Sequence, residues 1–242
     1  MAIGNRGEVK RIMLKLSGEA LGGESKFGIS YEFIETIIGD IRPLVKTGIE
    51  IGIVIGGGNF FRGSRLKDTR FSRLTGDYLG MIATIFNALA MADVFNQRGI
   101  FTQVMSAIPV GTLIEPYNRM KADEYLSKGK VVIFAGGTGN PFATTDSALC
   151  LRGIELDADL LLKATNVDGI YSDDPKKVDN SQLYSRITYD EALTKGLNVM
   201  DTAAFSLGRD HRKKLVVFNI NKKGALLDVV AGKSEGTIVE NE

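Results

Sequence analysis

The sequence predicts an α/β fold, a three-layer sandwich in which a mainly parallel central sheet carries helices on both faces. The first observation is that short apolar runs alternate with longer segments in which apolar residues recur at helical spacing. The second is that glycine-rich turns follow several of the apolar runs, as expected where a parallel strand leads into a helix. The third is a composition of 44% hydrophobic and 24% charged residues over 242 positions, which is that of a folded domain.

The first half of the chain alternates strand and helix patterns. Ser30 suits the N-cap of a helix, and Gly48 ends the apolar periodicity that follows it. The helix expected at 77–95 is apolar around nearly its whole circumference, so we expect it to be buried on several sides and to form a subunit interface. The other expected elements are strands at 11–16, 49–55, 100–105 and 131–134 and helices at 33–45 and 121–128.

The second half begins with a glycine-rich loop at 136–141 and continues the alternation. The expected elements are helical segments at 147–156, 188–195, 202–209 and 223–231, strands at 159–163, 215–219 and 237–239, a polar turn-rich run at 165–175 and an irregular stretch to 186. No repeat or long linker separates these elements. We therefore expect a single domain over 1–242, in which Gly136 comes nearest to dividing a lobe of about 1–135 from a lobe of about 136–242.

Charge and composition narrow the classes of function. Lys and Arg number 30 against 29 acidic residues, so no overall field favours nucleic acid or an anionic membrane. Cys150, the one cysteine, lies in an apolar helical pattern and fits a core residue in a reducing compartment. His211, the one histidine, is expected solvated at a helix end and leaves no His-based metal cage. We expect no signal peptide and no stretch able to span a bilayer, hence a cytoplasmic protein.

Two segments that follow the first two strands carry residues suited to phosphate. Lys15 lies within an apolar strand, where burying an ammonium group is costly unless the group reaches an anion at the strand's end. Glycines at 56–58 can turn their amides toward a phosphate, and Arg62 can bind one through two parallel hydrogen bonds. The Lys-Ser/Thr pair of a Walker A loop is missing after Gly63, which argues against a P-loop ATPase.

Two later segments carry similar signals. The loop after 131–134 leads into a helix start whose free N–H groups suit an anion, and its polar residues are Thr138, Thr145 and Asp146. In the run that begins at Lys163, Tyr171 offers a flat surface for a purine and Asp174 an acceptor for sugar hydroxyls. Since the carboxyl ends of parallel strands meet at one edge of a sheet, the four segments predict a ligand site at that edge.

Taken together, these segments resemble the amino acid kinase superfamily, from about Lys10 to the end of the chain. The motifs that carry the resemblance are Lys15-Leu-Ser-Gly18, Gly56-Gly-Gly-Asn-x-x-Arg62, Gly139-Asn-Pro-Phe-x-Thr-Thr-Asp146 and Lys163-Ala-Thr-x-Val-Asp-Gly. Within the superfamily the sequence most resembles the bacterial uridylate (UMP) kinase family, through Met105-Ser-Ala-Ile-Pro109, Gly137-Thr-Gly-Asn-Pro-Phe142 and Val199-Met-Asp201. The resemblance implies the superfamily's fold and a nucleoside monophosphate kinase of pyrimidine nucleotide biosynthesis, which transfers the γ-phosphoryl group of ATP, carried with Mg²⁺, directly in line to UMP and gives UDP.

The resemblance also implies a role for each matching residue. The implied catalytic residues are Lys15, Arg62, Asp146 and Asp201. The implied ATP-binding residues are Lys15, Leu16, Ser17, Gly18, Gly58, Arg62, Lys163, Thr165, Asn166, Tyr171 and Asp174. The implied UMP-binding residues are Gly57, Asp77, Thr138, Gly139, Asn140, Pro141, Phe142, Ala143, Thr144 and Thr145. A homohexamer activated by GTP and inhibited by UTP is implied as well, with the activator region at Gly23, Glu24, Ser25, Lys26, Phe27 and Gly28.

The residue chemistry agrees with this role. The phosphate of a nucleoside monophosphate is largely dianionic at neutral pH, since its second pKa lies near ~6, so the nucleophile needs no general base. Transfer then needs in-line positioning and positive charge, which Lys15, Arg62, Lys163 and magnesium supply. Magnesium usually keeps water and phosphate ligands, so no protein ligand to the metal is assigned.

Two alternatives use the same fold. A non-catalytic nucleotide sensor or storage module would bind ATP and release it unchanged, and the retention of every charged motif position argues against it. A kinase with a carboxylate or carbamate acceptor is disfavoured by Thr138-Gly-Asn-Pro-Phe. The residues themselves define a phosphate site, whereas the choice of uracil comes from the resemblance.

Overall fold

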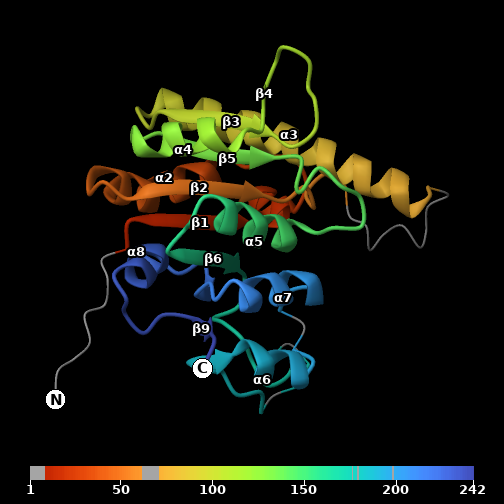
Figure 1. Cartoon of the computed structure of the whole chain (residues 1–242), viewed down its shortest axis with the longest axis vertical. Helices are drawn as coiled ribbons and strands as arrows, with labels where there is room; N and C mark the ends of the chain where they lie inside the picture. The colour runs from red at the N-terminus through yellow and green to blue at the C-terminus, as the bar shows by residue number, and fades with distance from the viewer. Residues whose placement is uncertain (1–8, 62–70, 176, 179, 198) are drawn as a thin grey trace.

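The structure is a computed structural model that describes residues 9–61, 71–175, 177–178, 180–197 and 199–242. One nine-stranded sheet runs through these residues (Figure 1), in the order β4-β3-β5-β2-β1-β6-β8-β9-β7. The strands are β1 Arg11–Leu16, β2 Glu50–Ile55, β3 Thr102–Ser106, β4 Glu115–Pro116, β5 Val131–Ala135, β6 Leu160–Thr165, β7 Arg186–Thr188, β8 Leu215–Asn219 and β9 Thr237–Glu240. The helices are α1 Gly18–Leu21, η1 Gly23–Ser25 (a 3₁₀ turn), α2 Tyr31–Lys46, α3 Arg73–Gln97, α4 Arg119–Ser127, α5 Thr145–Glu155, α6 Tyr189–Thr194, α7 Thr202–Asp210 and α8 Ala225–Val230.

The sheet is parallel from β4 to β8, and the change of direction comes at its far edge. There β9 runs antiparallel to β8, and β7 pairs with β9 in parallel. Every residue of β2 is buried, as expected for a parallel strand that is covered on both faces and therefore reads as one apolar run. The predicted three-layer sandwich with a mainly parallel sheet is thus confirmed.

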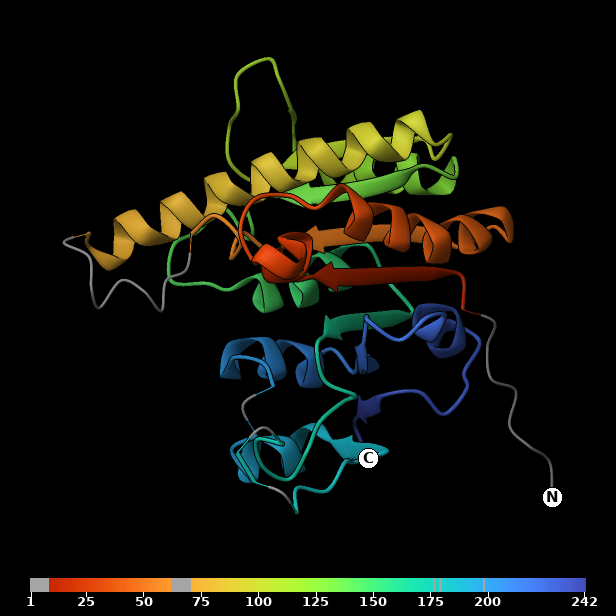
Figure 2. The ribbon, with the colours of Figure 1, turned by 180° about the vertical axis from the view of Figure 1, so that it is seen from behind.

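Helices cover both faces of the sheet. In Figure 1 helices α4 to α7 lie in front of it, and Figure 2 shows α2, α3 and α8 on the other side. Side chains of β1 alternate between the two resulting cores: Ile12, Leu14 and Leu16 pack with α2, α3 and α8, whereas Met13 packs with the α4–α7 side. Lys15 shares the face of Met13 because strand side chains alternate with a period of two. The lysine therefore lies on the face covered by α5.

Helix α3 is longer than the expected 77–95 helix. It begins at Arg73 because the side chain of Ser72 accepts a hydrogen bond from Thr75 N and caps the first turn. By length and composition α3 could cross a membrane, which corrects the expectation that no stretch could. However, 56% of its most apolar window is buried inside the protein, as in a core helix.

The short elements are the ones that the sequence patterns miss. Strand β7 falls in the stretch expected to be irregular, because three residues are too few for a pattern and their pairing with β9 forms the strand. Helix α1 is four residues long and is capped by Ser17, whose side chain accepts from Ala20 N.

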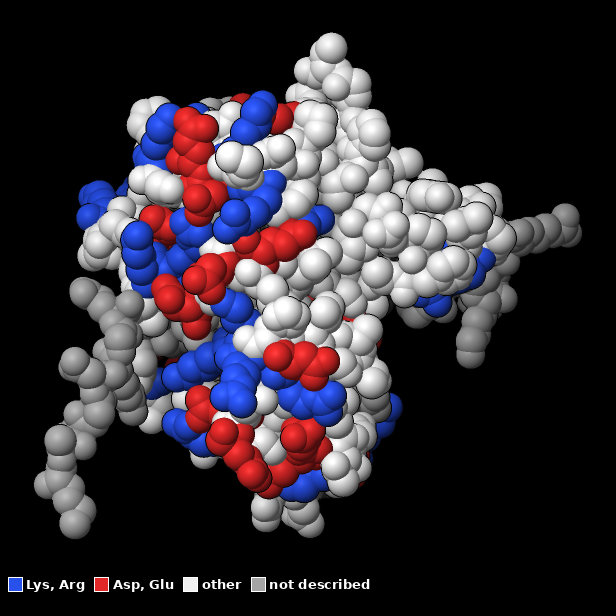
Figure 3. All heavy atoms as spheres, viewed as in Figure 1, with Lys and Arg blue, Asp and Glu red and all other residues white. Residues whose placement is uncertain are grey.

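Cys150 is fully buried and His211 caps the end of α7, as predicted. Acidic and basic side chains are intermixed on the face seen in Figure 3, in keeping with a net charge of +1.

Candidate active site

Two lysines lie side by side at the carboxyl ends of the central strands. In the parallel pairing of β1 with β6, Lys15 is the direct neighbour of Lys163. Both belong to the sheet face covered by α5, and only 9% of Lys15 and 8% of Lys163 is exposed. Two buried ammonium groups at such close range repel each other and lose hydration, so the site requires a negative partner.

Asp146 is that partner. It lies in the first turn of α5, and only 9% of the residue is exposed. Its Oδ1 is 3.2 Å from the Nζ of Lys15, and its Oδ2 accepts a hydrogen bond from the Nζ of Lys163. Lys163 also donates to the backbone carbonyl of Val199. One carboxylate thus fixes two ammonium groups from neighbouring strands, and we call these three residues the charged centre.

The Asp146 carboxylate of the charged centre stays ionised at neutral pH. Burial by itself would raise the pKa of Asp146, but the charges of Lys15 and Lys163 outweigh it and hold that pKa below its usual range. Burial lowers the pKa of Lys163, against the attraction of the Asp146 carboxylate. Because the centre carries two positive charges and one negative charge, it retains a net attraction for an anion such as phosphate.

The loop after β2 closely approaches the start of α1. A Cβ atom added to Gly18 would lie 2.4 Å from the N of Gly58 and 2.8 Å from the O of Gly56, so only glycine fits there. On the other side of the loop, a Cβ on Gly57 would lie 2.6 Å from the O of Gly80 in α3. The backbone at 56–58, which we call the phosphate loop, is therefore held between α1 and α3. Leu16 and Ser17 lie at the end of β1 and at the cap of α1, beside this loop.

Next to the charged centre, a pocket opens between the phosphate loop, α3 and the loop at 136–144. Its lining residues are Gly57, Gly58, Phe61, Gly76, Asp77, Gly80, Met81, Thr84, Gly137, Thr138, Asn140, Ala143, Thr144 and Thr145. Of the ten residues expected to bind UMP, it therefore brings together Gly57, Asp77, Thr138, Asn140, Ala143, Thr144 and Thr145. We call this cavity the acceptor pocket. It adjoins the charged centre directly, since Thr145 lines the pocket and the next residue is Asp146.

The other three residues expected to bind UMP, Gly139, Pro141 and Phe142, belong to the same loop but not to the lining. Phe142 has a positive φ of 64°, which is uncommon for a residue with a side chain. Its backbone N donates to the Oδ2 of Asp77 at 2.8 Å, so a carboxylate on α3 holds the loop at this point. The Phe142 ring itself is 67% exposed.

Asp201 links the loop to α7, and its charge also acts on Lys163. It is the N-cap of α7, with Oδ1 accepting from the N of Ala204 at 2.9 Å. The hydroxyl of Thr144 donates to Asp201, and the hydroxyl of Ser147 lies 3.2 Å from both of its carboxylate oxygens. In this arrangement Asp201 fixes the end of the 136–144 loop, and its expected catalytic role stays a prediction.

The residues expected at the nucleoside end of ATP lie at the end of β6 and on the loop that follows it. Thr165 Oγ1 donates to the O of Val167 at 2.7 Å, and Asn166 Oδ1 accepts from Asn221 Nδ2 at 3.3 Å. Tyr171 forms an isolated bridge with Leu183, and Asp174 pairs with Lys177 at 3.3 Å. These contacts hold the segment after β6 in its own shape. None of them connects Tyr171 or Asp174 to Lys15 or Lys163. Arg62 lies outside the described residues.

The expected activator region contributes one contact to the site. Gly23–Ser25 form η1, and Lys26 has left-handed backbone geometry with a φ of 56°. The carbonyl of Gly28 accepts a hydrogen bond of 2.6 Å from the side chain of Asn59. This segment is thus tied to the residue that follows the phosphate loop.

Three buried polar residues of the site were missed by the sequence interpretation. Thr84 and Asn87 on α3 and Asn59 after the phosphate loop are each no more than 2% exposed. Thr84 Oγ1 accepts from the N of Gly136 at 2.7 Å, and Asn87 Nδ2 donates to the O of Gly56 at 2.7 Å. Polar side chains on the buried face of an otherwise apolar helix were the available signal.

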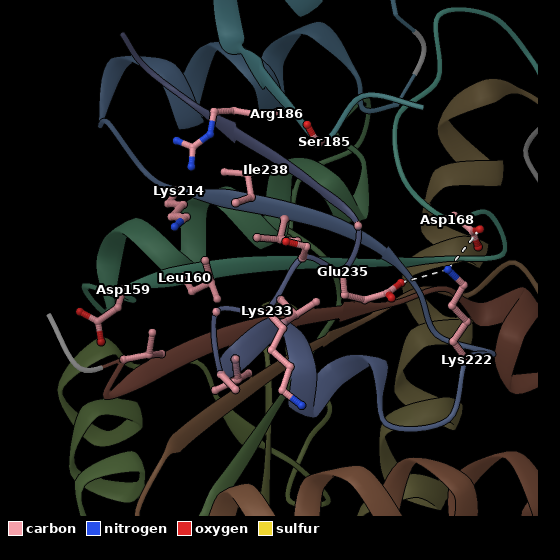
Figure 4. Close-up of a pocket in the computed structure, with 18 of the residues that line it drawn as sticks. Asp159, Leu160, Asp168, Ser185, Arg186, Lys214, Lys222, Lys233, Glu235 and Ile238 are labelled. Carbon is pink, nitrogen blue, oxygen red and sulfur yellow. Dashed lines mark hydrogen bonds and ion pairs between the residues drawn. The ribbon is translucent and has the colours of Figure 1, made fainter. Parts of the chain in front are cut away.

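Another hollow lies along β8, β9 and α8 (Figure 4). Its volume is about 840 Å³, and three of its basic residues have acidic partners, which are Glu240 for Arg186, Asp228 for Lys233 and two lining carboxylates for Lys222. Lys222 lies 3.1 Å from Asp168 and 3.3 Å from Glu235, as the dashed lines in Figure 4 indicate. The pocket at the carboxyl ends of the strands, although smaller, adjoins the buried charges of Lys15, Asp146 and Lys163.

Comparisons with known proteins show that the chain is similar to members of one family over nearly its whole length. Residues 10–219 match the model of the amino acid kinase family. The chain is 52% identical over 233 residues to a uridylate kinase of Colwellia psychrerythraea, covering 96% of this chain and 94% of the relative. It is 49% identical over 242 residues to a uridylate kinase of Pseudoalteromonas translucida, covering 100% and 97%. Its structure is similar to that of a UMP kinase from Bacillus anthracis, with a TM-score of 0.94, 35% identity and 98% of each chain covered. A uridylate kinase from Archaeoglobus fulgidus gives a TM-score of 0.72 at 27% identity, covering 94% and 99%.

Proposed function

The chain belongs to the amino acid kinase family, and we propose on that premise that it transfers the γ-phosphoryl group of ATP to UMP. The observation that carries the proposal is the junction of two sites within the first turn of α5. Thr145 lines the acceptor pocket, and Asp146 holds Lys15 and Lys163 beside it. An acceptor phosphate in the pocket would therefore face two fixed ammonium groups, which is the arrangement that phosphoryl transfer requires.

The residues act by positioning and by charge. In-line transfer places the attacking oxygen, the phosphorus and the leaving oxygen roughly in a row, while negative charge spreads over the transferring group. Lys15 and Lys163 stabilise that charge, and Asp146 keeps both ammonium groups directed at it. Asp146 does not act as a base, because its pKa is held below the usual range and the acceptor phosphate is already ionised.

Backbone amides complete the phosphate contacts in this proposal. Gly57 and Gly58 lie where β2 ends, and close packing against Gly18 and Gly80 fixes their backbone. Fixed amides cost no reorganisation when charge develops on the transferring group. We assign Gly18 and Gly58 to the ATP phosphates and Gly57 to UMP, with the nucleoside of ATP on the loop after β6.

The site suits magnesium that arrives on the phosphates of ATP. Both oxygens of Asp146 face ammonium groups, and Asp201 is engaged by Ala204 N and Thr144. Such engaged carboxylates leave the metal to phosphate and water ligands, which Mg²⁺ commonly prefers in kinases. When bound, the ion would neutralise charge on the β- and γ-phosphates.

We further propose a cytoplasmic homohexamer that serves pyrimidine nucleotide biosynthesis, with GTP and UTP as effectors and without nucleic acid as a partner. An exposed apolar stripe on α3 supports the oligomer: Tyr78 is 46%, Ile82 44% and Phe86 58% exposed. In this proposal the half up to about residue 135 provides the acceptor side and the subunit interface, and the half from 136 provides the ATP side.

The test is formation of nucleoside diphosphate from ATP and Mg²⁺, with UMP, CMP, AMP and a carbamate source offered in separate reactions. We expect turnover with UMP alone. A preparation of Lys15→Ala, purified in the same way, measures the background from contaminating kinases. Turnover with a different acceptor would overturn the substrate, and ATP binding without turnover in any reaction would make the protein a nucleotide sensor.

A further inference from the structure

We propose that Asn59 and Asn87 are positioning residues that hold the phosphate loop in place for phosphoryl transfer. The inference rests on the proposed function for its kinetic consequence, but its structural basis is independent of the acceptor. Asn59 directly follows the phosphate loop, and Asn87 lies on α3. They are 2% and 0% exposed, respectively.

The two side-chain amides form a reciprocal pair. Asn59 Nδ2 donates to Asn87 Oδ1 at 2.8 Å, and Asn87 Nδ2 donates to Asn59 Oδ1 at 2.8 Å. Each nitrogen has a second N–H, and each donates it to a backbone carbonyl. Asn87 donates to Gly56 at 2.7 Å, and Asn59 donates to Gly28 at 2.6 Å. All four N–H groups of the pair are therefore used.

The burial of this amide network indicates that it fixes the geometry of the segments that it joins. A buried amide is unfavourable unless its hydrogen bonds are made, and apolar side chains of similar shape would fill the same space without that requirement. A fully satisfied buried network, by contrast, fixes the groups that it joins in one geometry. Here the joined groups are the first carbonyl of the phosphate loop, a turn of α3 and the end of the Gly22–Gly28 segment.

The pair also determines how β1 meets the loop. A Cβ on Gly18 would lie 2.6 Å from the Oδ1 of Asn59, so the start of α1 packs directly on this side chain. Gly18 is three residues after Lys15, whose ammonium belongs to the charged centre. A shift of Asn59 would therefore move the phosphate loop relative to both α1 and the charged centre.

An aromatic layer lies outside the amide pair. The rings of Phe27 and Phe60 have centroids 5.9 Å apart, as do the rings of Phe60 and Phe86. Each of these residues is the sequence neighbour of one member of the network, namely Gly28, Asn59 and Asn87. The three rings, which are 38–68% exposed, thus lie at the surface beside the segments that the network joins.

The experiment compares Asn87→Leu with Met91→Ala. Met91 lies one turn further along α3, is fully buried and belongs to the apolar core, so its truncation destabilises the same helix without touching the loop. Both variants and the double variant Asn59→Leu/Asn87→Leu are assayed at a temperature where circular dichroism shows each one folded. Rates are expressed per folded enzyme.

We expect Asn87→Leu to lower kcat for UMP phosphorylation by about 100-fold, as small misplacements of catalytic groups do, with KM changed by less than about threefold. The double variant should regain part of the lost stability, because neither amide is then left unpaired, while kcat stays low. A kcat for Asn87→Leu equal to that of Met91→Ala would overturn the inference, as would recovery of kcat in the double variant.

A second measurement keeps the inference separate from the proposed function. Amide hydrogen exchange of a peptide covering 56–61 should accelerate in Asn87→Leu and stay at the wild-type rate in Met91→Ala. Equal protection in the two variants would overturn the inference whichever acceptor the enzyme uses. Failure of the wild-type protein to phosphorylate UMP would instead count against the proposed function.

Discussion

The charged centre and the acceptor pocket lie side by side at one edge of the sheet, yet they consist of different types of residue. Lys15, Asp146 and Lys163 are each at most 9% exposed and hold one another through charge. The acceptor pocket is lined mainly by glycines, threonines and backbone, and its loop is held by the side chains of Asp77, Thr84 and Asp201. The first region therefore depends on a few buried side chains, and the second on the shape of a supported loop.

From this difference we expect the charged centre to determine kcat and the supported loop to determine KM. Buried charge strengthens interaction with a developing anion, so changes in the charged centre should act on kcat. The 136–144 loop surrounds the acceptor and lies outside the charged centre, so changes in the supports of this loop should act on KM. The phosphate loop packs against α1, close to Lys15, and its supports should act on kcat instead. The three variants below test this division.

Lys15→Ala should have the largest effect. Removing one of two ammonium groups takes away charge stabilisation in the transition state, and we expect kcat to fall on the order of 10³-fold. The fold should persist, since Asp146 keeps its bond to Lys163. Steady-state kinetics with a thermal melt provides the measurement. Lys10→Ala is the control, because the Lys10 side chain is 76% exposed and 3.7 Å from Glu50. A rate near that of the control would refute the assigned role of Lys15.

Asp146→Asn should cost both activity and stability. Loss of the buried carboxylate leaves two buried ammonium groups without a counter-charge, and we expect about 3–5 kcal/mol less stability at neutral pH. The folded-state pKa of Asp146 lies below its unfolded value of about 3.9. The carboxylate therefore stabilises the fold above that value, and its contribution is lost as pH falls through the folded-state pKa.

Urea unfolding at several pH values measures this contribution. The gap between wild type and Asp146→Asn should be full at neutral pH and should close only as the solution becomes more acidic than pH ~4. Asp157→Asn, which removes a 92% exposed carboxylate beside Lys213, is the control and should show a small gap throughout. A gap for Asp146→Asn no larger than that of the control would mean that the centre does not stabilise the fold.

Asp77→Ala should have the smallest effect and should act on KM. The variant frees the N of Phe142, so the loop at 136–144 loses one of its supports. We expect KM for the acceptor to rise about tenfold with kcat within about threefold of wild type. Asp93→Ala is the matched control on the same helix, because Asp93 accepts from Gln97 at 2.7 Å near the far end of α3. A fall in kcat alone would break the proposed division between the regions.

Much of the fold could be predicted because buried parallel strands have a clear sequence pattern. The run at 11–16 is β1 in full, and the run at 131–134 falls one residue short of β5. The location of the site followed as well, because the carboxyl ends of parallel strands meet at one edge. What the patterns could not provide was strand order. That Lys15 and Lys163 are direct neighbours depends on β1 pairing with β6, a contact between opposite halves of the chain.

The support of the loops could not be predicted for a different reason. Asn87 lies in an apolar helix, where a polar residue lowers local helix preference and gives no sign of its partner. Its partners, Asn59 and the carbonyl of Gly56, are specified only by how α3 packs against the loop after β2. Likewise, Asp201 is a good N-cap by sequence, but its bonds to Thr144 and Ser147 require α5 and α7 to be neighbours.

The central place of β1 has a consequence for how the protein is made. β1 is synthesised first, but its two neighbours are β2 and β6, and β6 ends at Thr165. Until the ribosome has produced that strand, β1 presents an apolar edge with unpaired backbone groups, the kind of surface that chaperones bind. The lysine pair is completed at the same moment. Nascent chains stalled before β6 should therefore be protease-sensitive, and chains stalled well beyond it should become resistant.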